Sequence, residues 1–197
     1  MKTENLQITA KAPTACSDVE IADFVALVLA GGEVTPHGLE GRVRSAERIA
    51  FLRGNGSLLG VAGLKHPSQK HRNEIAALSG VPLRSNEFPF ELGWIFILPI
   101  ARGRRLSLPL CSLLIEAAVT QGVFATSRTE NDGMHRTLSK LGLLPAGAAY
   151  KSPQGNHQLQ AFLRHAAQPR GKPKGPGSRE SKEQIKGAGV DLNSHGL

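Results

Sequence analysis

Hydrophobic and polar positions along this chain repeat with two different periods, and the period changes several times between its ends. Short runs rich in apolar and β-branched residues predict strands, and apolar positions three and four apart predict amphipathic helices. Strands are expected over residues 6–10, 49–53, 58–65, 91–98, 123–126, 143–150 and 157–163. Helices are expected over residues 21–29, 37–46, 69–78, 106–122 and 131–142. The sequence therefore predicts an α/β fold of the mixed α+β kind.

Local signals mark several of these boundaries. Ser17 and Glu20 have the spacing of a capping box, which starts a helix by satisfying its first backbone N–H groups. Gly54-Asn55-Gly56-Ser57 is a strong turn signal between two apolar runs, so we expect a β-hairpin there. Asn131 is expected to cap the helix that follows it, and Gly142 to end that helix.

The stretch from Phe90 to Ala118 gives the first indication of function. An apolar strand runs into a turn rich in arginine and glycine, and the turn opens directly into a helix. Such a turn directs unpaired backbone N–H groups and the positive end of a helix dipole toward one place. Because Arg102, Arg104 and Arg105 lie in the same turn, it predicts a phosphate or pyrophosphate site; the alternative is an ordinary solvated turn.

Composition adds constraints on partners and location. The 197 residues carry a net charge of +8, which favours anionic partners, with polyanions as one option. No apolar run approaches the roughly 18 residues that span a bilayer, so no membrane is expected as a partner. The first residues are polar and the chain has only two cysteines, which favours a reducing cytoplasm. No histidines or cysteines have metal-ligand spacing, so no metal site is expected.

The character of the chain changes near its end. Residues 166–197 contain six Lys/Arg against three Asp/Glu, are rich in glycine and proline, and have no aromatic residue. Such a segment cannot bury enough apolar surface to fold by itself, so we expect a disordered basic tail. The remaining residues, 1–165, are expected to form one domain.

Two segments resemble the GNAT superfamily of N-acetyltransferases. Residues 98–107 are similar to its pyrophosphate-binding signature, Arg/Gln-x-x-Gly-x-Gly/Ala, and residues 127–143 are similar to its later strand-Asn-helix-Leu-Gly-Phe segment. Two signature positions differ, because Arg105 and Ser107 stand where the family has glycine and glycine or alanine. The resemblance implies a central, mostly antiparallel sheet with splayed central strands, flanked by helices.

The resemblance also implies a cosubstrate, acetyl-CoA, and a set of residues that bind it. The pantetheine arm is expected beside the fourth strand, and an N–H near Ile97 or Leu98 is expected to hold the developing oxyanion. Asn131 is expected to contact the cofactor arm. The implied cofactor-binding residues are Ile97, Leu98, Arg102, Gly103, Arg104, Arg105, Leu106, Ser107 and Asn131.

Candidate catalytic residues follow from the same comparison. Glu91 and Glu87 are candidate bases for the acceptor amine, and His135 is a candidate proton donor or cofactor contact. The structural alternatives are a solvated carboxylate at the strand edge for Glu91, a polar loop residue for Glu87 and the outer face of a helix for His135. Leu138 occupies the position where the family often has a proton-donating tyrosine.

The implied function is acetyl transfer from acetyl-CoA to a primary amine by direct attack. The acceptor stays unidentified, and the protein is expected to be a monomer or homodimer. Two other classes stay open: a non-catalytic acyl-CoA-binding module, favoured by Leu138 and Arg105, and a nucleic-acid-binding protein, favoured by the net charge. No nucleic-acid-binding motif or aromatic stacking platform supports the latter.

Overall fold

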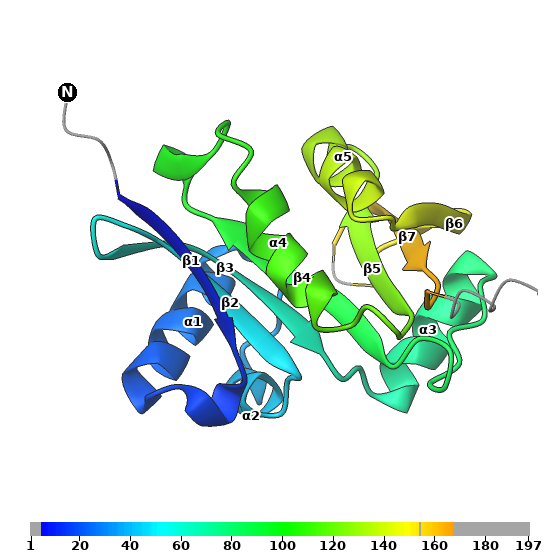
Figure 1. Ribbon diagram of the computed structural model, residues 1–197. Helices are drawn as coiled ribbons and strands as arrows, with labels where there is room; N and C mark the ends of the chain where they lie inside the picture. The colour runs from blue at the N-terminus through cyan, green and yellow to red at the C-terminus, as the bar shows by residue number, and fades with distance from the viewer. Residues whose placement is uncertain (1–4, 154, 168–197) are drawn as a thin grey trace, which may run out of the picture.

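Seven strands of the chain form one mixed sheet. The computed structural model describes residues 5–153 and 155–167, and its strands are β1 (Leu6–Lys11), β2 (Arg48–Gly54), β3 (Ser57–Lys65), β4 (Phe90–Ile97), β5 (Val123–Arg128), β6 (Leu144–Lys151) and β7 (Gln158–Arg164). Their order across the sheet is β1-β2-β3-β4-β5-β7-β6 (Figure 1). Every neighbouring pair is antiparallel except β4 and β5, which run parallel. The predicted mixed and mostly antiparallel sheet is confirmed.

Five helices lie on both faces of this sheet. They are α1 (Asp18–Ala30), α2 (Leu39–Arg44), α3 (Gln69–Ser79), α4 (Ser107–Glu116) and α5 (Asp132–Lys140). In Figure 1, α1 and α2 lie on one side of β1–β3 and α4 lies on the other. Successive residues of β2 divide between the two cores, as the alternation of a strand requires. Ile49 and Phe51 pack with α1 and α2, whereas Ala50 and Leu52 pack with α4.

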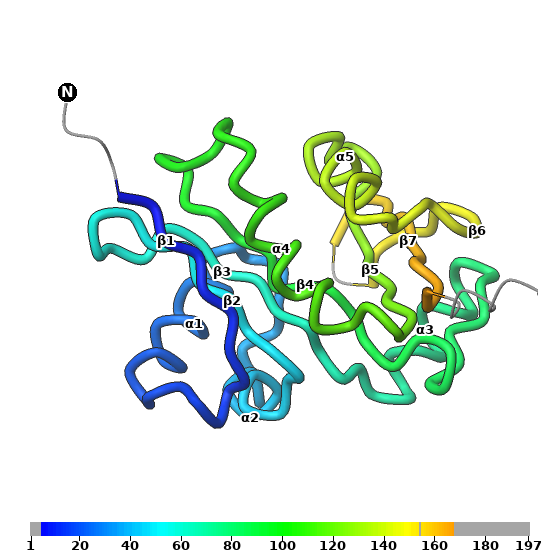
Figure 2. Tube along the Cα trace, viewed as in Figure 1, coloured from blue at the N-terminus to red at the C-terminus, as the bar shows by residue number. Residues whose placement is uncertain are grey.

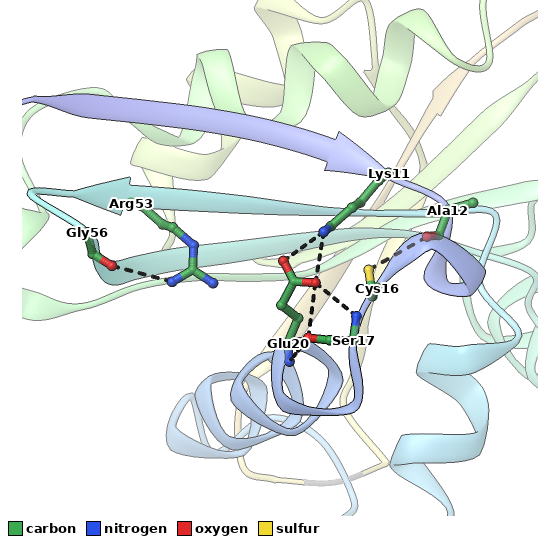
Figure 3. Close-up of polar contacts among 7 residues, drawn as sticks. All are labelled: Lys11, Ala12, Cys16, Ser17, Glu20, Arg53 and Gly56. Atoms are coloured by element: carbon green, nitrogen blue, oxygen red, sulfur yellow. Dashed lines mark hydrogen bonds and ion pairs between the residues drawn. The ribbon is translucent and has the colours of Figure 1, made fainter.

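The start of α1 has the predicted capping box. Ser17 Oγ accepts a hydrogen bond from the Glu20 backbone N–H at 3.3 Å, and the Glu20 carboxylate accepts one from the Ser17 N–H at 2.9 Å. Lys11 at the end of β1 extends this network, because its ammonium lies 2.7 Å from Glu20 Oε1 (Figure 3). The cap therefore also fixes the angle at which the chain leaves β1.

The predicted elements are present, with small shifts at their ends. The main difference is α4, which ends at Glu116 instead of continuing to Gly122. No helix among the described residues is long and apolar enough to cross a bilayer. The tail predicted over 166–197 lies outside the described residues except for its first two positions.

The sheet divides between β4 and β5. These strands pair only at their beginnings, Phe90 with Val123 and Glu91 with Phe124, and then separate. The trace in Figure 2 allows the two strands to be followed as they part. On its other side β4 has a bulge, because its register against β3 shifts between Val61 and Gly63. Trp94 lies in this bulge with a φ of 52°, so the strand bends there. The predicted splay of the central strands is confirmed.

Candidate active site

A cavity of about 1170 Å³ occupies the space where β4 and β5 part. Its walls come from residues 92–96 of β4, residues 125–128 of β5, helix α3 and the segment after α1. Beyond Glu91 and Phe124, the facing edges of the two strands do not pair with each other. An extended ligand placed there can therefore hydrogen bond to strand backbone as an added strand does.

A buried carboxylate lies at the point where the strands separate. Glu91 is only 4% exposed, and each of its oxygens has a nitrogen partner: Lys65 Nζ lies 2.7 Å from Oε1, and His71 Nε2 lies 3.1 Å from Oε2. Burial by itself would raise the pKa of Glu91, but Lys65 and His71 more than offset this and lower it to about 2. Glu91 is therefore ionised at neutral pH and is a weak base.

The partners of Glu91 come from two other elements. Lys65 ends β3 directly opposite Glu91 in the ladder, and His71 lies in the first turn of α3. Both line the cavity, and the side chain of His71 is 43% exposed. Glu87, the other candidate base, lies apart from this cluster. It pairs with Arg84 at the surface and does not line the cavity.

Arg72 fixes the place where β4 and β5 begin. Its guanidinium is buried, donates hydrogen bonds to the carbonyl oxygens of Phe88 and Pro89, and lies 5.6 Å from the centroid of the Phe124 ring. Burial lowers the pKa of Arg72, and Glu91 opposes that shift. One side chain of α3 thus holds the residues just before β4 against the beginning of β5.

Tyr150 contributes a hydroxyl group without a partner. The residue is 6% exposed, lines the cavity, and its oxygen forms no hydrogen bond within the described part of the chain. Two extra residues of β6 between Ala146 and Tyr150 shift the register against β7, so a bulge sets the position of this side chain. Burial, and then Glu91 and Glu74, raise the pKa of Tyr150 to about 12. The hydroxyl therefore stays protonated at neutral pH.

The turn after β4 has the conformation that its glycine and arginine pattern suggests. Gly103 and Arg105 have φ values of 76° and 59°, and α4 begins at Ser107. Within residues 5–153 and 155–167, the backbone N–H groups of Gly103, Arg105, Leu106 and Ser107 form no hydrogen bond with protein. The turn is tied to α5, because Ser107 Oγ lies 3.0 Å from Thr137 Oγ1. None of residues 102–107 lines the cavity itself.

The end of β4 distinguishes Ile97 from Leu98. The Leu98 N–H donates to the Leu59 carbonyl, so it is not available for the oxyanion role that the sequence suggested. Successive residues of an antiparallel strand direct their N–H and C=O groups toward alternate edges of the strand. Because the Leu98 N–H faces β3, the backbone groups of Ile97 face the other edge of β4, on the side of β5. There Arg102 Nε donates to the Ile97 carbonyl at 2.8 Å, and the Arg102 guanidinium lies 5.4 Å from the Phe96 ring centroid.

Two other predicted site residues, Asn131 and His135, lie at the start of α5 but face different cavities. Asn131 caps the helix, its Oδ1 accepting from the Met134 N–H at 3.1 Å, and it lines the cavity. His135 faces elsewhere: its Nε2 lies 2.9 Å from the Arg128 carbonyl oxygen, its ring contacts Phe162, and it lines a separate cavity of about 580 Å³. The structure therefore does not bring His135 together with Glu91.

Lys65, His71 and Tyr150 are the site residues that sequence reasoning missed. Tyr150 had the clearest signal, because the chain has one tyrosine and one tryptophan, and both line the cavity. Lys65 and His71 had no local signal. Among the described residues, no group of three or more His, Cys, Asp or Glu side chains could hold a metal ion.

Comparisons with known proteins identify the fold. No protein-family model matches the chain, and no curated protein matches it. Solved structures do match. An acyl-CoA N-acyltransferase from Pseudomonas aeruginosa is 14% identical, with a TM-score of 0.59 over 81% of this chain and 99% of that one. A GNAT-family acetyltransferase from Streptococcus agalactiae is 15% identical, with a TM-score of 0.59 over 83% and 96%.

A third match was solved with a ligand. The protein yncA from Salmonella typhimurium, with its cofactor acetyl-CoA, is 14% identical and has a TM-score of 0.57 over 86% of this chain and 99% of that one. All three matches extend over almost the whole length of the matched chains. The seven-stranded sheet that parts between β4 and β5 is therefore the fold of the GNAT-superfamily N-acetyltransferases.

Proposed function

We propose that this protein transfers an acyl group, acetyl in the first place, from acyl-CoA to an amine of an acceptor. The observation that carries the proposal is the parting of β4 and β5 beside a turn in which the N–H groups of Gly103, Arg105, Leu106 and Ser107 have no hydrogen-bond partner among the described residues. Those two features suit the two ends of such a cosubstrate, an extended amide-containing arm and a pyrophosphate. The acyl-transferring structures of the same fold support the reaction class.

The turn is suited to the pyrophosphate end. Left-handed φ values at Gly103 and Arg105 turn the chain into α4, where the Leu106 and Ser107 N–H groups have no hydrogen-bond partner among the described residues. The positive end of the α4 dipole and the arginines of the turn add favourable charge. Asn131 uses its Oδ1 in the helix cap, which leaves its amide NH₂ as a donor toward the arm in the cavity.

The acyl group would lie near the bulge of β4, with the acceptor amine approaching from the side of α3. The amine nitrogen forms a bond to the thioester carbon, the C–S bond breaks, and its electron pair leaves with the sulfur. The Ile97 N–H, at the open edge of β4, is the candidate donor to the oxyanion. Holding the two reactants oriented in one cleft lowers the activation free energy by several kcal/mol, and by about 7 kcal/mol or more when the geometry is favourable.

Tyr150 has a role as a hydrogen-bond donor to the bound ligands. A phenol with a pKa of about 12 is too weak an acid to be an efficient proton source for a thiolate, whose own pKa is near that of a free thiol, about 8.5. The departing thiolate therefore takes its proton from solvent. The Tyr150 hydroxyl instead offers a neutral donor in a cavity that also contains Glu91 and Glu74.

Thermal unfolding with acetyl-CoA tests the proposal. A ligand present at about 100 times its dissociation constant adds roughly 2.7 kcal/mol to the free energy of unfolding. We expect a clear increase in Tm with acetyl-CoA and little with AMP, which lacks both pyrophosphate and pantetheine. Release of CoA thiol with a panel of amines (spermidine, tyramine, kanamycin and an α-N-acetyl-lysine amide) then tests transfer. No shift at millimolar acetyl-CoA would contradict the proposal.

A second candidate function is acyl-CoA binding without transfer. It is favoured by Leu138, which is fully buried and lines the cavity at the place where the family often has a tyrosine. The same experiments separate the two functions. A binding module would show the acetyl-CoA shift in Tm but no amine-dependent release of thiol.

A further inference from the structure

We infer that His71, oriented by Glu91, is the group that takes the proton from the acceptor amine. This inference rests on the proposed function, because it names the base for that reaction. It assigns Glu91 the part of a positioning residue instead of that of the base. The geometry around the Glu91 carboxylate carries the argument.

Glu91 cannot easily serve as the base itself. One oxygen is bound by Lys65 and the other by His71, at 2.7 and 3.1 Å, and the side chain is only 5% exposed. A substrate nitrogen would have to displace one of these partners to reach it. His71 in contrast lines the cavity with nearly half of its side chain exposed.

The contact with Glu91 determines which nitrogen of His71 is free. The carboxylate is ionised and can only accept a hydrogen bond, so Nε2, the nitrogen next to it, must carry a hydrogen. In the neutral ring Nδ1 then has the lone pair. His71 is thus held as the Nε2–H tautomer, with its basic nitrogen on the side of the ring opposite Glu91.

Lys65 completes the arrangement by balancing charge. Lys65 and Glu91 already form a close ion pair, so the buried carboxylate does not require a proton on His71 for its neutralisation. The charge of the Glu91 carboxylate is thus balanced by Lys65 alone, and a base accepts a proton only in its neutral form. After proton transfer, the imidazolium is stabilised by the same carboxylate.

The proton balance is as follows. An acceptor that arrives as an ammonium ion gives one proton to His71 Nδ1, and this proton later leaves to solvent. The neutral amine forms the C–N bond while the C–S bond breaks and the electron pair passes to sulfur. The attacking nitrogen loses its second proton to solvent or to the regenerated His71, and the thiolate takes up one proton. The net products are the amide, CoA thiol and one free proton.

His66 provides a matched control. It also lines the cavity, it is half-exposed, and its Nε2 lies 3.3 Å from Glu47 Oε2. Glu47, however, is 39% exposed and lies outside β4 and β5. The His66 ring is tilted against the Phe90 ring. His66 therefore has the same kind of contact without a buried, fixed carboxylate.

Nitrogen-15 NMR of the full-length protein tests the tautomer without any substrate. At a pH where His71 is neutral, we expect its long-range couplings to show the Nε2–H form in wild type and a mixture of tautomers in Glu91→Gln. If Glu91→Gln does not fold, the wild-type spectrum alone decides. A neutral His71 with its hydrogen on Nδ1 would overturn the inference.

Activity with acetyl-CoA and the amine panel tests the chemical role. We expect His71→Ala to lower kcat about 100-fold or more while the acetyl-CoA shift in Tm stays unchanged. Added imidazole should restore part of the lost rate in His71→Ala, because the His71 side chain is 43% exposed in the cavity, and imidazole should not change the rate of His66→Ala. Equal rates for His71→Ala and wild type, or a loss that imidazole does not change, would overturn the inference.

These results separate failure of the inference from failure of the proposed function. If wild type neither binds acetyl-CoA nor acylates any panel amine, the proposed function fails, and with it the role of His71 as a base. If wild type acylates an amine and His71→Ala does so equally well, only the inference fails.

Discussion

The ring of Trp94 lies directly over Gly63: a Cβ atom at position 63 would come 2.5 Å from Trp94 Cε3. Trp94 is the bulged residue of β4, and its edge contacts Phe24 of α1 at a centroid distance of 6.0 Å. The ring is therefore held in the core and cannot move aside easily. Gly63 is the residue of β3 that makes room for the bulge.

Gly63→Ala should consequently destabilise the protein and disturb the cavity. We expect the free energy of unfolding to fall by about 1–3 kcal/mol, since the added methyl group must displace a packed ring. Binding of acetyl-CoA should weaken as well, because the bulge sets the direction of the open edge of β4. Urea unfolding and calorimetric titration measure the two effects.

Gly41→Ala serves as the control for adding a methyl group. Gly41 lies in α2 and has nothing within 4 Å of its ideal Cβ position. Alanine should stabilise this helix by about 1 kcal/mol. If Gly63→Ala behaved like Gly41→Ala, the bulge would not depend on a glycine beneath Trp94.

Arg105 offers a test of the turn after β4. Its φ of 59° is left-handed, a conformation that costs a non-glycine residue roughly 1–2 kcal/mol. We expect Arg105→Gly to be more stable than Arg105→Ala by about 1 kcal/mol, because both lose the side chain and only glycine loses the strain. Urea unfolding of the two variants measures the difference. Equal stabilities would mean that the turn has a different backbone conformation in solution.

The same position shows what the sequence could predict. The strand, the turn and the helix from Phe90 onward follow from local periodicity, and the left-handed φ of Arg105 falls where the family signature has a glycine. Residue-local rules also predicted the capping box at Ser17 and the cap at Asn131. Signals of this kind depend on a few neighbouring residues, so they can be recognised in the sequence without knowledge of the fold.

The residues that meet in the candidate active site could not be predicted in this way. Lys65 and Glu91 meet only because β3 and β4 pair in one register, and His71 reaches them from a helix inserted between those strands. His135 follows Met134, and one helical step turns the two side chains about 100° apart. Met134 therefore lines the cavity between β4 and β5, and His135 faces the other way.

The arginines of the turn provide a test of cosubstrate binding. Replacing Arg102 and Arg104 together by alanine should weaken acetyl-CoA binding about tenfold or more, because charge and donors near the pyrophosphate are lost. Calorimetric titration measures the dissociation constant. Arg48→Ala with Arg84→Ala makes the same change in net charge at the other end of the sheet, near the start of β4, and should have a much smaller effect. Equal losses in both double variants would indicate general electrostatic attraction only.

Glu91 predicts a dependence of stability on pH. Its pKa is lowered from 4.5 to about 2, so as pH falls the unfolded chain takes up the proton first. The stabilisation is therefore complete above about pH 5 and is lost as pH falls toward 2, by about 3 kcal/mol in total and about 2 kcal/mol by pH 3. In urea unfolding, the difference in free energy of unfolding between wild type and Glu91→Gln should shrink by about 2 kcal/mol between pH 6 and pH 3. Parallel curves would contradict the ion pairs of Glu91 with Lys65 and His71.

Tyr150 predicts opposite effects on stability and on activity. Its hydroxyl is buried without a hydrogen-bond partner among the described residues, and such a group costs about 1–3 kcal/mol. Tyr150→Phe keeps the ring, so we expect its free energy of unfolding to rise by about 1 kcal/mol while amine acylation slows. Tyr150→Leu removes the ring as well and should destabilise the protein by about 2 kcal/mol or more, since the ring packs with Ile75 and Phe124. Urea unfolding and thiol release measure the two properties. A Tyr150→Phe variant that is less stable than wild type and equally active would mean that the hydroxyl serves the fold and not the ligand.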